Sequence, residues 1–460
     1  MEALYTAVPI VFESKIRSKE VDFTNVDSLL KYFTLASNRK INGKYVNQLM
    51  LALKMQQNYS QFDVHMASRL LSRICSLPVD FDYNLDFDLM TQICRICSQK
   101  IVSGLPEVDN KNVTNRILGQ ISRLYCRVLN KRLLFSIYDG KLLDMALDHL
   151  SDNFDQLTLD DAYHLIYNLS HLNHYDKRML EKFYFMFLEN YEHYINQTSI
   201  RPGGLVYAFF TPLTFDKFDL RHLFNLVLNP KKVASLRGDI DSLISIVRNL
   251  CILGIYEPTE VYEEFFRLLY NEKFFVLRRR YVLKTLRMLY MEMCLNEGTL
   301  PETFAQHRSK VESLLIENEK DSEFSIQNSL KEDPRLNEIF GTDQIYEKGY
   351  RTRLGHRLGY VVVYDTIEKQ LIPIEQEWKQ KSFIEEVQLL SHQKLVHLLV
   401  LNDSVCRQPG VHRPIVDFYL KTLKHLDLVT AVIDLNKLKL QLSNDAIKDA
   451  VIKDIESKLK

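Results

Sequence analysis

The C-terminal segment, residues 394–460, constrains the fold more than any other part of the chain. An apolar run at 395–401 is followed by a polar turn at 402–404, by a helical pattern that continues to about His425, and by a β-branched run at 429–433. Two short apolar runs that flank a helix are typical of neighbouring parallel strands joined by a crossover helix. The segment therefore predicts a small α/β module.

The same module begins before residue 394. The run 358–365 has the pattern of a strand and 371–374 that of a second, and the loop between them has the length of a hairpin connection. Asn444 is placed to cap a final helix, since apolar residues recur every four positions after it. Those residues are Ile447, Val451, Ile455 and Leu459. We therefore expect an α/β domain over 346–460.

The preceding sequence is typical of helices. The 460 residues include only 14 glycines and 12 prolines, whereas Leu, Lys and Glu, which favour helices, are abundant. Amphipathic patterns with short polar joints extend from residue 21 to about residue 305. Helices are expected at 27–33, with Asp27 as N-cap, and at 45–55, 64–77 and 89–98.

Two segments in the middle of the chain resemble each other. Residues 164–176 and 245–257 share an Asn-Leu pair, a later leucine, and a tyrosine followed by an acid. Each leads into an aromatic helix, and residues 205–228 between them have the pattern of a degenerate middle copy. A helix–turn–helix unit then recurs about every 40 residues, which is the period of helical-hairpin solenoids. The pattern predicts a solenoid-like body. The alternative is that any all-α chain shows such echoes by chance.

A polar stretch separates the two regions. Residues 317–337 are rich in Glu, Asp, Ser and Asn and contain Asp333-Pro334, which is typical of a linker. We therefore predict a mainly α protein in three parts. They are a helical-repeat body over 1–316, an acidic and polar linker over 317–345, and the α/β domain over 346–460.

Composition excludes several classes of protein. Lys plus Arg and Asp plus Glu both number 59, so that only local clusters can argue for a nucleic-acid partner. Seven scattered cysteines, an odd number, are typical of reduced thiols. No apolar run has the length needed to span a bilayer. Residues 1–20 contain three glutamates, unlike an import presequence, so that such a signal is absent, has been cleaved, or is replaced by an unconventional import route.

No motif for catalysis or cofactor binding is present. The chain has no P-loop, no Gly-x-Gly-x-x-Gly after a strand and no Gly-x-Ser-x-Gly. Cys94 and Cys97 form a CxxC pair, but zinc needs four ligands and no second pair stands at a compatible spacing. The pair fits the buried face of a helix. We therefore expect no cofactor, no metal and no catalytic residue.

Two clusters of basic residues form the candidate binding site. The first lies on a predicted helix that also carries Tyr281 and Tyr290, and the second precedes the strand at 358–365. Their members are Arg278, Arg279, Arg280, Lys284 and Arg287, and then Arg351, Arg353 and Arg357. Such residues can neutralise phosphates while the tyrosines stack on bases. The alternative is that both clusters are solvated or salt-bridged faces.

Residues 395–438 resemble a known module. The apolar strand ends in Asn402-Asp403, a polar loop carries Cys406-Arg407, and a Leu- and Lys-rich helix precedes the second strand. This order resembles the RAP domain, a small module of the restriction-endonuclease-like fold at the C-terminus of organellar RNA-binding proteins. The helical body is similar in style to the repeats of the FAST-kinase-like family and of apicomplexan RAP proteins.

The sequence departs from that family where a nuclease needs its ligands. The first strand is wholly apolar, only Asp403 remains of the expected acids, and Asp417-Phe418-Tyr419 stands where basic residues are expected. A metal-dependent nuclease needs clustered carboxylates and a lysine. Asp403 with Lys421 or Lys424 does not supply them. The resemblance therefore implies a degenerate, non-catalytic RAP-like domain.

The resemblance also implies a function and a location. It predicts a mitochondrial matrix protein that binds rRNA or mRNA and works with protein subunits in a ribonucleoprotein assembly such as the mitochondrial ribosome. Three alternatives stay open: a helical scaffold that binds proteins without touching RNA, a transcript-stability factor, and a metal-dependent nuclease that uses Asp403.

Overall fold

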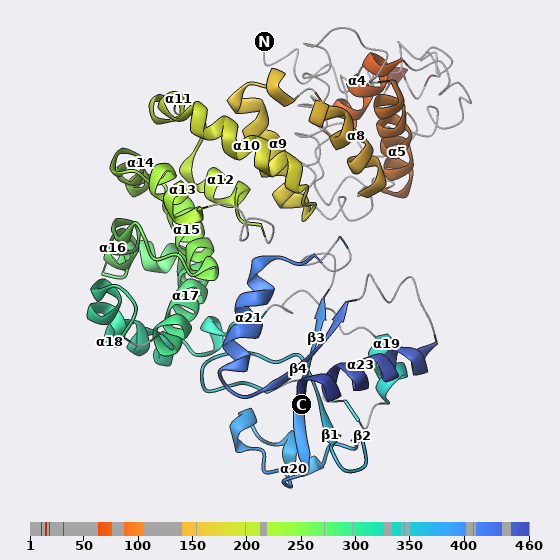
Figure 1. Ribbon diagram of the computed structural model, residues 1–460, viewed down its shortest axis with the longest axis vertical. Helices are drawn as coiled ribbons and strands as arrows, with labels where there is room; N and C mark the ends of the chain where they lie inside the picture. Colours follow the sequence, from red (N-terminus) through yellow and green to blue (C-terminus); the bar gives the residue numbers. More distant parts are fainter. Residues whose placement is uncertain are drawn as a thin grey trace. The chain divides into compact units, whose positions relative to one another are not determined.

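The computed structural model in Figure 1 describes most of the chain after residue 139 and parts of it before. The described residues are 63–75, 87–104, 140–152, 154–197, 199–211, 219–270, 272–296, 298–325, 334–341, 344–345, 350–401, 408, 411–434, 443–459 and isolated positions before residue 32. The helices expected at 27–33 and 45–55 lie outside them. The chain forms two compact units, Met1–Ile200 and Arg201–Lys460.

The first unit consists of helices in its described part. They are α4 (Val64–Cys75), α5 (Phe87–Gly104), α8 (Gly140–Asp152), α9 (Leu159–Leu172), α10 (Lys177–Glu189) and α11 (Tyr191–Asn196), with a short 3-10 turn, η4 (Phe154–Gln156), before α9. Helix α5 packs against both α4 and α8. The helices expected at 64–77 and 89–98 are therefore confirmed as α4 and α5.

The two similar segments fold alike. Helix α9 ends at Asn173, which has φ +53°, and α15 (Ile240–Leu253) ends at Gly254, which has φ +66°. Asn and Gly are the residues that most readily adopt this left-handed conformation, so the chain reverses direction at the end of each of these two helices. The second helices of the pairs, α10 and α16 (Thr259–Leu268), then pack against the first. Each segment is thus a helix–turn–helix.

In the second unit, helices α12 (Pro202–Ala208) to α18 (Glu302–Glu317) form a two-layered stack. Beside α12, α15, α16 and α18 it contains α13 (Leu220–Val227), α14 (Pro230–Ser235) and α17 (Glu272–Leu295), with a 3-10 turn, η6 (Leu236–Gly238), before α15. Helix α17 packs on α15, and α18 packs on α16. Figure 1 shows α13, α15 and α17 in one row and α14, α16 and α18 in a second row beside it. Neighbouring hairpins therefore share one core.

A four-stranded mixed sheet completes the second unit. It is built from β1 (Tyr360–Asp365), β2 (Gln370–Ile372), β3 (Gln393–Leu401) and β4 (Val429–Asp434), in the order β2-β1-β3-β4. Strand β1 is antiparallel to β2 and β3, and β3 is parallel to β4. The expected hairpin and the expected parallel pair are both confirmed. The observed fold class is therefore a mainly helical chain with a small mixed sheet near its C-terminus.

Helices cover both faces of the sheet. One face packs on α19 (Pro334–Phe340) and α23 (Asn444–Leu459) through alternate residues of β1, β3 and β4. On the other face His397 of β3 contacts Tyr419 of α21 (Pro414–Lys424), and Val363 packs on Trp378 of the short helix α20 (Gln376–Lys379). This double coverage explains why all six residues of β1 are buried.

Two details differ from the sequence expectations. The first helical amides of α23 bond to the carbonyl of Ser443, so the cap lies one residue before Asn444. The segment 317–345 does not act as a spacer in its described part. A 3-10 turn, η7 (Lys320–Ser322), is followed by Phe324, which packs on Phe418 and Tyr419, and α19 contributes Leu336, Ile339 and Phe340 to the core of the sheet. Its apolar residues, few as they are, anchor it.

Side chains of α23 bind backbone groups directly at the β4 edge of the sheet and support Gln344, which binds one at the β2 edge. At β4, Asp454 accepts from the Val432 amide at 3.2 Å and Lys458 donates to the Thr430 carbonyl at 2.7 Å. At β2, Gln344 donates to the Leu371 carbonyl at 3.4 Å and is held by Lys448 of α23 at 3.0 Å. Edge strands with unpaired groups recruit other strands, and these contacts oppose that.

We predict that the double change Asp454→Ala and Lys458→Ala opens the edge of β4. The free energy of unfolding should fall by about 1–2 kcal/mol, because two hydrogen bonds to charged side chains are lost. Sedimentation should show concentration-dependent association through the exposed strand. The matched control is Lys453→Ala, an exposed position on the same helix. A double variant that sediments like the unaltered protein contradicts the prediction.

Candidate nucleic-acid interface

Helix α17 carries the first predicted basic cluster, and its members face different surroundings. The side chain of Arg278 lies outside the described part of the chain. Arg279 donates a hydrogen bond to the Asn318 side chain, at the end of α18. Arg280 is exposed, and Lys284 is half-buried one turn later on the same side of the helix. Among the described side chains of this cluster, Arg280 and Lys284 are thus the ones that can meet a ligand.

Arg287 is buried and braces the interior. Only 6% of it is exposed, and its guanidinium donates to the Ser322 hydroxyl at 2.9 Å and to the Leu354 carbonyl at 3.4 Å. Gly355 has φ +100° and lies against this group, where a Cβ atom would come within 2.5 Å of Nε. Desolvation lowers the pKa of Arg287. Arg287 therefore positions a loop and is not available to a phosphate.

The second predicted cluster is largely neutralised inside the chain. Glu323 bridges Arg351 at 2.7 Å and Arg357 at 3.5 Å, and Arg351 also approaches Glu319 at 3.9 Å. Arg353 is exposed, and its backbone amide donates to Glu385 at 2.9 Å. The salt-bridged alternative thus describes Arg351 and Arg357.

The expectation that both basic clusters are available to bind RNA needs correction for half of their members. The structure does bring the two clusters near each other, because Arg287 reaches both η7 and the loop at Leu354. Contacts within the chain nevertheless occupy four of the eight: Arg279, Arg287, Arg351 and Arg357. The reason is that the acidic segment after α18 folds back onto them and does not span open solvent.

Two cations that the sequence analysis did not single out join Arg280 and Lys284. Arg248 lies on α15, which packs on both α17 and α21, and Arg413 immediately precedes α21. Desolvation lowers the pKa of Lys284, and the charges of Arg280 and Arg248 lower it further. Desolvation likewise lowers the pKa of Arg248, and Arg413 adds to that effect. We call Arg248, Arg280, Lys284 and Arg413 the cationic cluster.

Three members of the cationic cluster lack a carboxylate partner in the part of the chain that the structure describes. Among the described residues, none forms an ion pair with Arg248, Arg280 or Lys284. Like charges held together without counterions destabilise a fold, and their positive potential attracts anions. A single arginine between Val247 and Asn249 on an apolar helix was the available sequence signal. Only the packing of three helices shows that it belongs to a cluster.

Two tyrosines border the cationic cluster. Tyr207 of α12 accepts a hydrogen bond from Arg413, whose guanidinium carbon lies 5.8 Å from the centre of the ring. Tyr281 of α17 follows Arg280 directly and is 65% exposed. Both lie near enough to Arg248 to raise its pKa against the desolvation. The cluster therefore combines positive charge with aromatic surface, as single-stranded nucleic-acid sites do.

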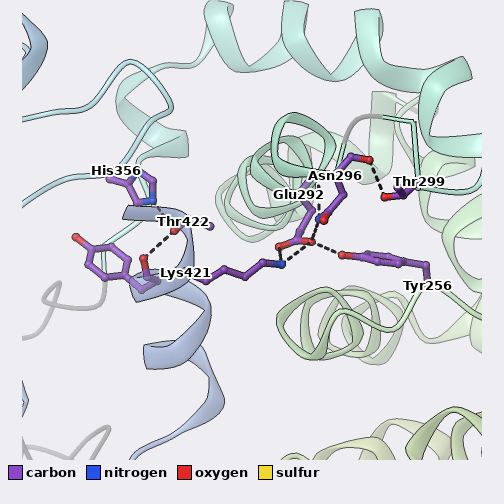
Figure 2. Close-up of polar contacts among 8 residues, drawn as sticks. Tyr256, Glu292, Asn296, Thr299, His356, Lys421 and Thr422 are labelled. Carbon is purple, nitrogen blue, oxygen red and sulfur yellow. Dashed lines mark hydrogen bonds and ion pairs between the residues drawn. The ribbon is translucent and has the colours of Figure 1, made fainter. Parts of the chain in front are cut away.

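A buried carboxylate fixes the helices that carry these residues. Glu292 of α17 is fully buried, and Figure 2 shows it between Tyr256 and Lys421. It accepts hydrogen bonds from the Tyr256 hydroxyl, from Asn296 at 2.5 Å and from Lys421 of α21 at 3.0 Å. Burial raises the pKa of Tyr256, and Cys251 and the Glu292 carboxylate raise it further. The Glu292–Lys421 pair thus ties the α/β part of the unit to the helical stack.

A neutral histidine holds the other side of α21. His356 and Thr422 lie side by side in Figure 2, with 2.7 Å between Nε2 and Oγ1. The Thr422 hydroxyl donates to the Tyr419 carbonyl, so its oxygen accepts from Nε2–H, and Nδ1 accepts from Thr352 at 2.9 Å. Desolvation, with the charges of His397 and Arg287, lowers the pKa of His356 to about 3.

The described residues offer no alternative centre for metal chemistry. Within them, no group of three or more His, Cys, Asp or Glu side chains could hold a metal ion. Cys94 and Cys97 are fully buried on α5, and burial raises the pKa of Cys97, so its thiol stays protonated. Asp403 lies outside the described residues. No helix of the described part is long and apolar enough to cross a membrane.

A cavity of about 590 Å³ opens between α13, α14 and α16, away from the cationic cluster's residues. Its charged lining includes Glu264, which pairs with both Arg237 and Arg267. The lining also includes Glu260 and Glu263, so acidic residues outnumber basic ones there, in contrast to the cationic cluster.

Comparison with known proteins identifies no family for the chain. No protein-family model matches the chain, and no curated protein sequence matches it. The resemblance to the RAP domain therefore rests on the residues of 395–438 alone.

We predict that Lys421→Ala lowers the free energy of unfolding by about 1–2 kcal/mol, because Glu292 stays buried with only neutral donors. Denaturant unfolding measures the change. Lys424→Ala is the matched control, since this lysine is exposed on the same helix. In a Glu292→Gln background the effect of Lys421→Ala should shrink, and an unchanged effect would show that the pair is not coupled.

We also predict a loss of stability as the pH falls from 6.5 towards 4. Burial lowers the pKa of His356 to about 3 and of His397 to about 4, from 6.5. Between these pKa values the unfolded chain binds protons that the folded chain does not bind. The free energy of unfolding therefore falls by up to about 1.4 kcal/mol per pH unit for each histidine. The carboxyls of Asp176 and Asp365, whose pKa values lie below 3.8, act only at lower pH.

Denaturant titrations between pH 7.5 and 4.5 test this pH dependence. His356→Asn and His397→Asn should each reduce the slope, whereas His425→Asn, at an exposed position, should leave it unchanged. A slope that is the same in all three variants contradicts the assignment.

Proposed function

We propose that this protein is a non-catalytic RNA-binding protein of the mitochondrial matrix that works within a ribonucleoprotein assembly such as the mitochondrial ribosome. The observation that carries the RNA contact is the cationic cluster, in which Arg248, Arg280, Lys284 and Arg413 gather on three packed elements. Among the residues that the structure describes, no carboxylate pairs with the first three. A bound polyanion would neutralise that repulsion, and the positive potential of the cluster would increase its affinity.

The architecture supports the same proposal. Helical hairpins that stack in two layers, as α15–α16 and α17–α18 do, are the building principle of a helical-repeat solenoid. The mixed sheet with helices on both faces agrees with a RAP-like module of the restriction-endonuclease-like type. Together with the sequence pattern of 395–438, these features support an organellar RNA-binding protein over a protein scaffold.

The residues assigned to RNA change accordingly. Arg280, Lys284 and Arg353 keep the role that the sequence gave them, because they are accessible. Arg248 and Arg413 join them. Arg279, Arg287, Arg351 and Arg357 hold the fold together in this proposal. The absence of catalysis rests on the sequence, where Asp403 stands without the clustered carboxylates of a nuclease.

We predict that the double change Arg280→Ala and Lys284→Ala weakens binding to a stem–loop RNA by about 10- to 100-fold at low salt. The slope of log affinity against log salt should fall by about 1.4–1.8, because two phosphate contacts are lost. Fluorescence anisotropy across a salt titration measures both quantities.

The control for this experiment is Lys310→Ala with Lys320→Ala, which removes the same charge from exposed positions of α18 and η7. It should keep most of the affinity and the slope. If the unaltered protein shows no affinity for RNA, or an affinity that ignores salt, the proposed function is wrong.

A further inference from the structure

We propose that the cationic cluster binds single-stranded RNA and that Tyr281 provides the surface on which an unpaired base stacks. This inference rests on the proposed function, because it names the form of RNA that the same site takes. Three observations carry it: the exposure of Tyr281, its position among the cations, and the contrast with Tyr207.

The first observation is that the Tyr281 ring lies open. It is 65% exposed, and in the described part of the chain its ring stacks on no other aromatic group. Its backbone carbonyl accepts from the Thr285 hydroxyl at 3.0 Å, which holds the helix and leaves the ring unused. A large aromatic ring in water contributes nothing to the core, so its surface is available to a partner.

The second observation is where the ring stands. Arg280 precedes Tyr281, and Lys284 follows one turn later on the same side of α17. Arg248 of the adjacent helix α15 lies within electrostatic reach of Tyr281. Cations on both sides of a ring match the alternation of phosphate and base along one strand. In a duplex the bases are stacked on each other, so an exposed ring has nothing to receive.

The third observation is the contrast with Tyr207. That tyrosine is engaged, because its hydroxyl accepts from Arg413 and its ring lies under the Arg413 guanidinium. A tyrosine that served only to shield cations would be expected to make such contacts. Tyr281 makes none that the described residues show, although it borders the same cluster. Its free ring is therefore assigned to the ligand.

An acidic protein segment is the competing occupant. It would pair with Arg248, Arg280 and Lys284 through carboxylates, and it would gain little from an aromatic ring. A polyanion without bases has the same indifference to the ring. The contribution of Tyr281 therefore separates single-stranded RNA from every ligand that recognises charge alone.

The experiment measures three probes with the same number of phosphates by competition and anisotropy: a single-stranded oligouridylate, an RNA duplex with half as many base pairs as the single strand has nucleotides, and inorganic polyphosphate. Tyr281→Ala should weaken binding of the single strand by about 5- to 150-fold, the range of one base stacked on one aromatic ring. Its salt slope should stay as in the unaltered protein, because no cation is removed. Duplex and polyphosphate should bind as before.

Two variants sharpen the result. Tyr281→Phe should restore single-strand binding, since the ring remains. Tyr270→Ala is the matched control, because Tyr270 is also exposed, at 60%, but lies beside His307 of α18, with which its hydroxyl forms a hydrogen bond of 3.0 Å. It should bind the single strand normally. Thermal unfolding of each variant checks that the fold is kept, and removal of an exposed ring should shift it little.

The inference is overturned if Tyr281→Ala binds the single strand normally, or if it loses polyphosphate and duplex to the same extent. The failure of the proposed function looks different. In that case Arg280→Ala with Lys284→Ala changes the binding of no probe, whatever Tyr281 does. If an acidic peptide competes better than the single strand and Tyr281→Ala leaves that competition unchanged, the occupant is a protein.

Discussion

The buried carboxylate of Glu292 is the constraint on which the second unit depends. A buried ionised group must be fully hydrogen-bonded, because burying a charge that lacks a donor lowers the free energy of unfolding by as much as many apolar contacts raise it. Here the donors are Tyr256 between α15 and α16, Asn296 directly after α17, and Lys421 on α21. The position of α21 against α17 is therefore set by charge and direction as well as by apolar packing, which alone tolerates sliding.

This constraint also places the cationic cluster. Lys421 lies on the helix that Arg413 introduces, and Glu292 lies two turns beyond Lys284 on α17. A helix transmits a position rigidly over such lengths, so fixing one end fixes the cations at the other. Arg287, braced by Ser322 and Leu354, and His356, bonded to Thr422, add polar contacts to the same junction. The junction is thus rigid where the proposed ligand binds.

Local patterns in the sequence were sufficient for the elements but not for the site. The strands at 358–365 and 429–433 and the apolar face of the last helix follow from periodicity, which each segment carries in its own residues. The fate of a cation does not. Arg351 and Arg357 look like phosphate ligands until Glu323, which lies in a segment with the composition of a linker, is seen between them. Arg248 shows the converse, because its neighbours Lys284 and Arg413 come from distant parts of the chain.

The difference between paired and unpaired cations then has a physical meaning. The second unit neutralises Arg351 and Arg357 with Glu323, and Arg237 and Arg267 with Glu264, so the chain has carboxylates available where charge must be compensated. It provides none among the described residues for Arg248, Arg280 and Lys284, and it holds the resulting repulsion in place through the Glu292–Lys421 pair. Repulsion that a fold could remove and instead retains is explained most simply by a counterion that arrives from outside. A phosphate chain supplies such charges at regular intervals, and the exposed ring of Tyr281 gives its bases a place beside them.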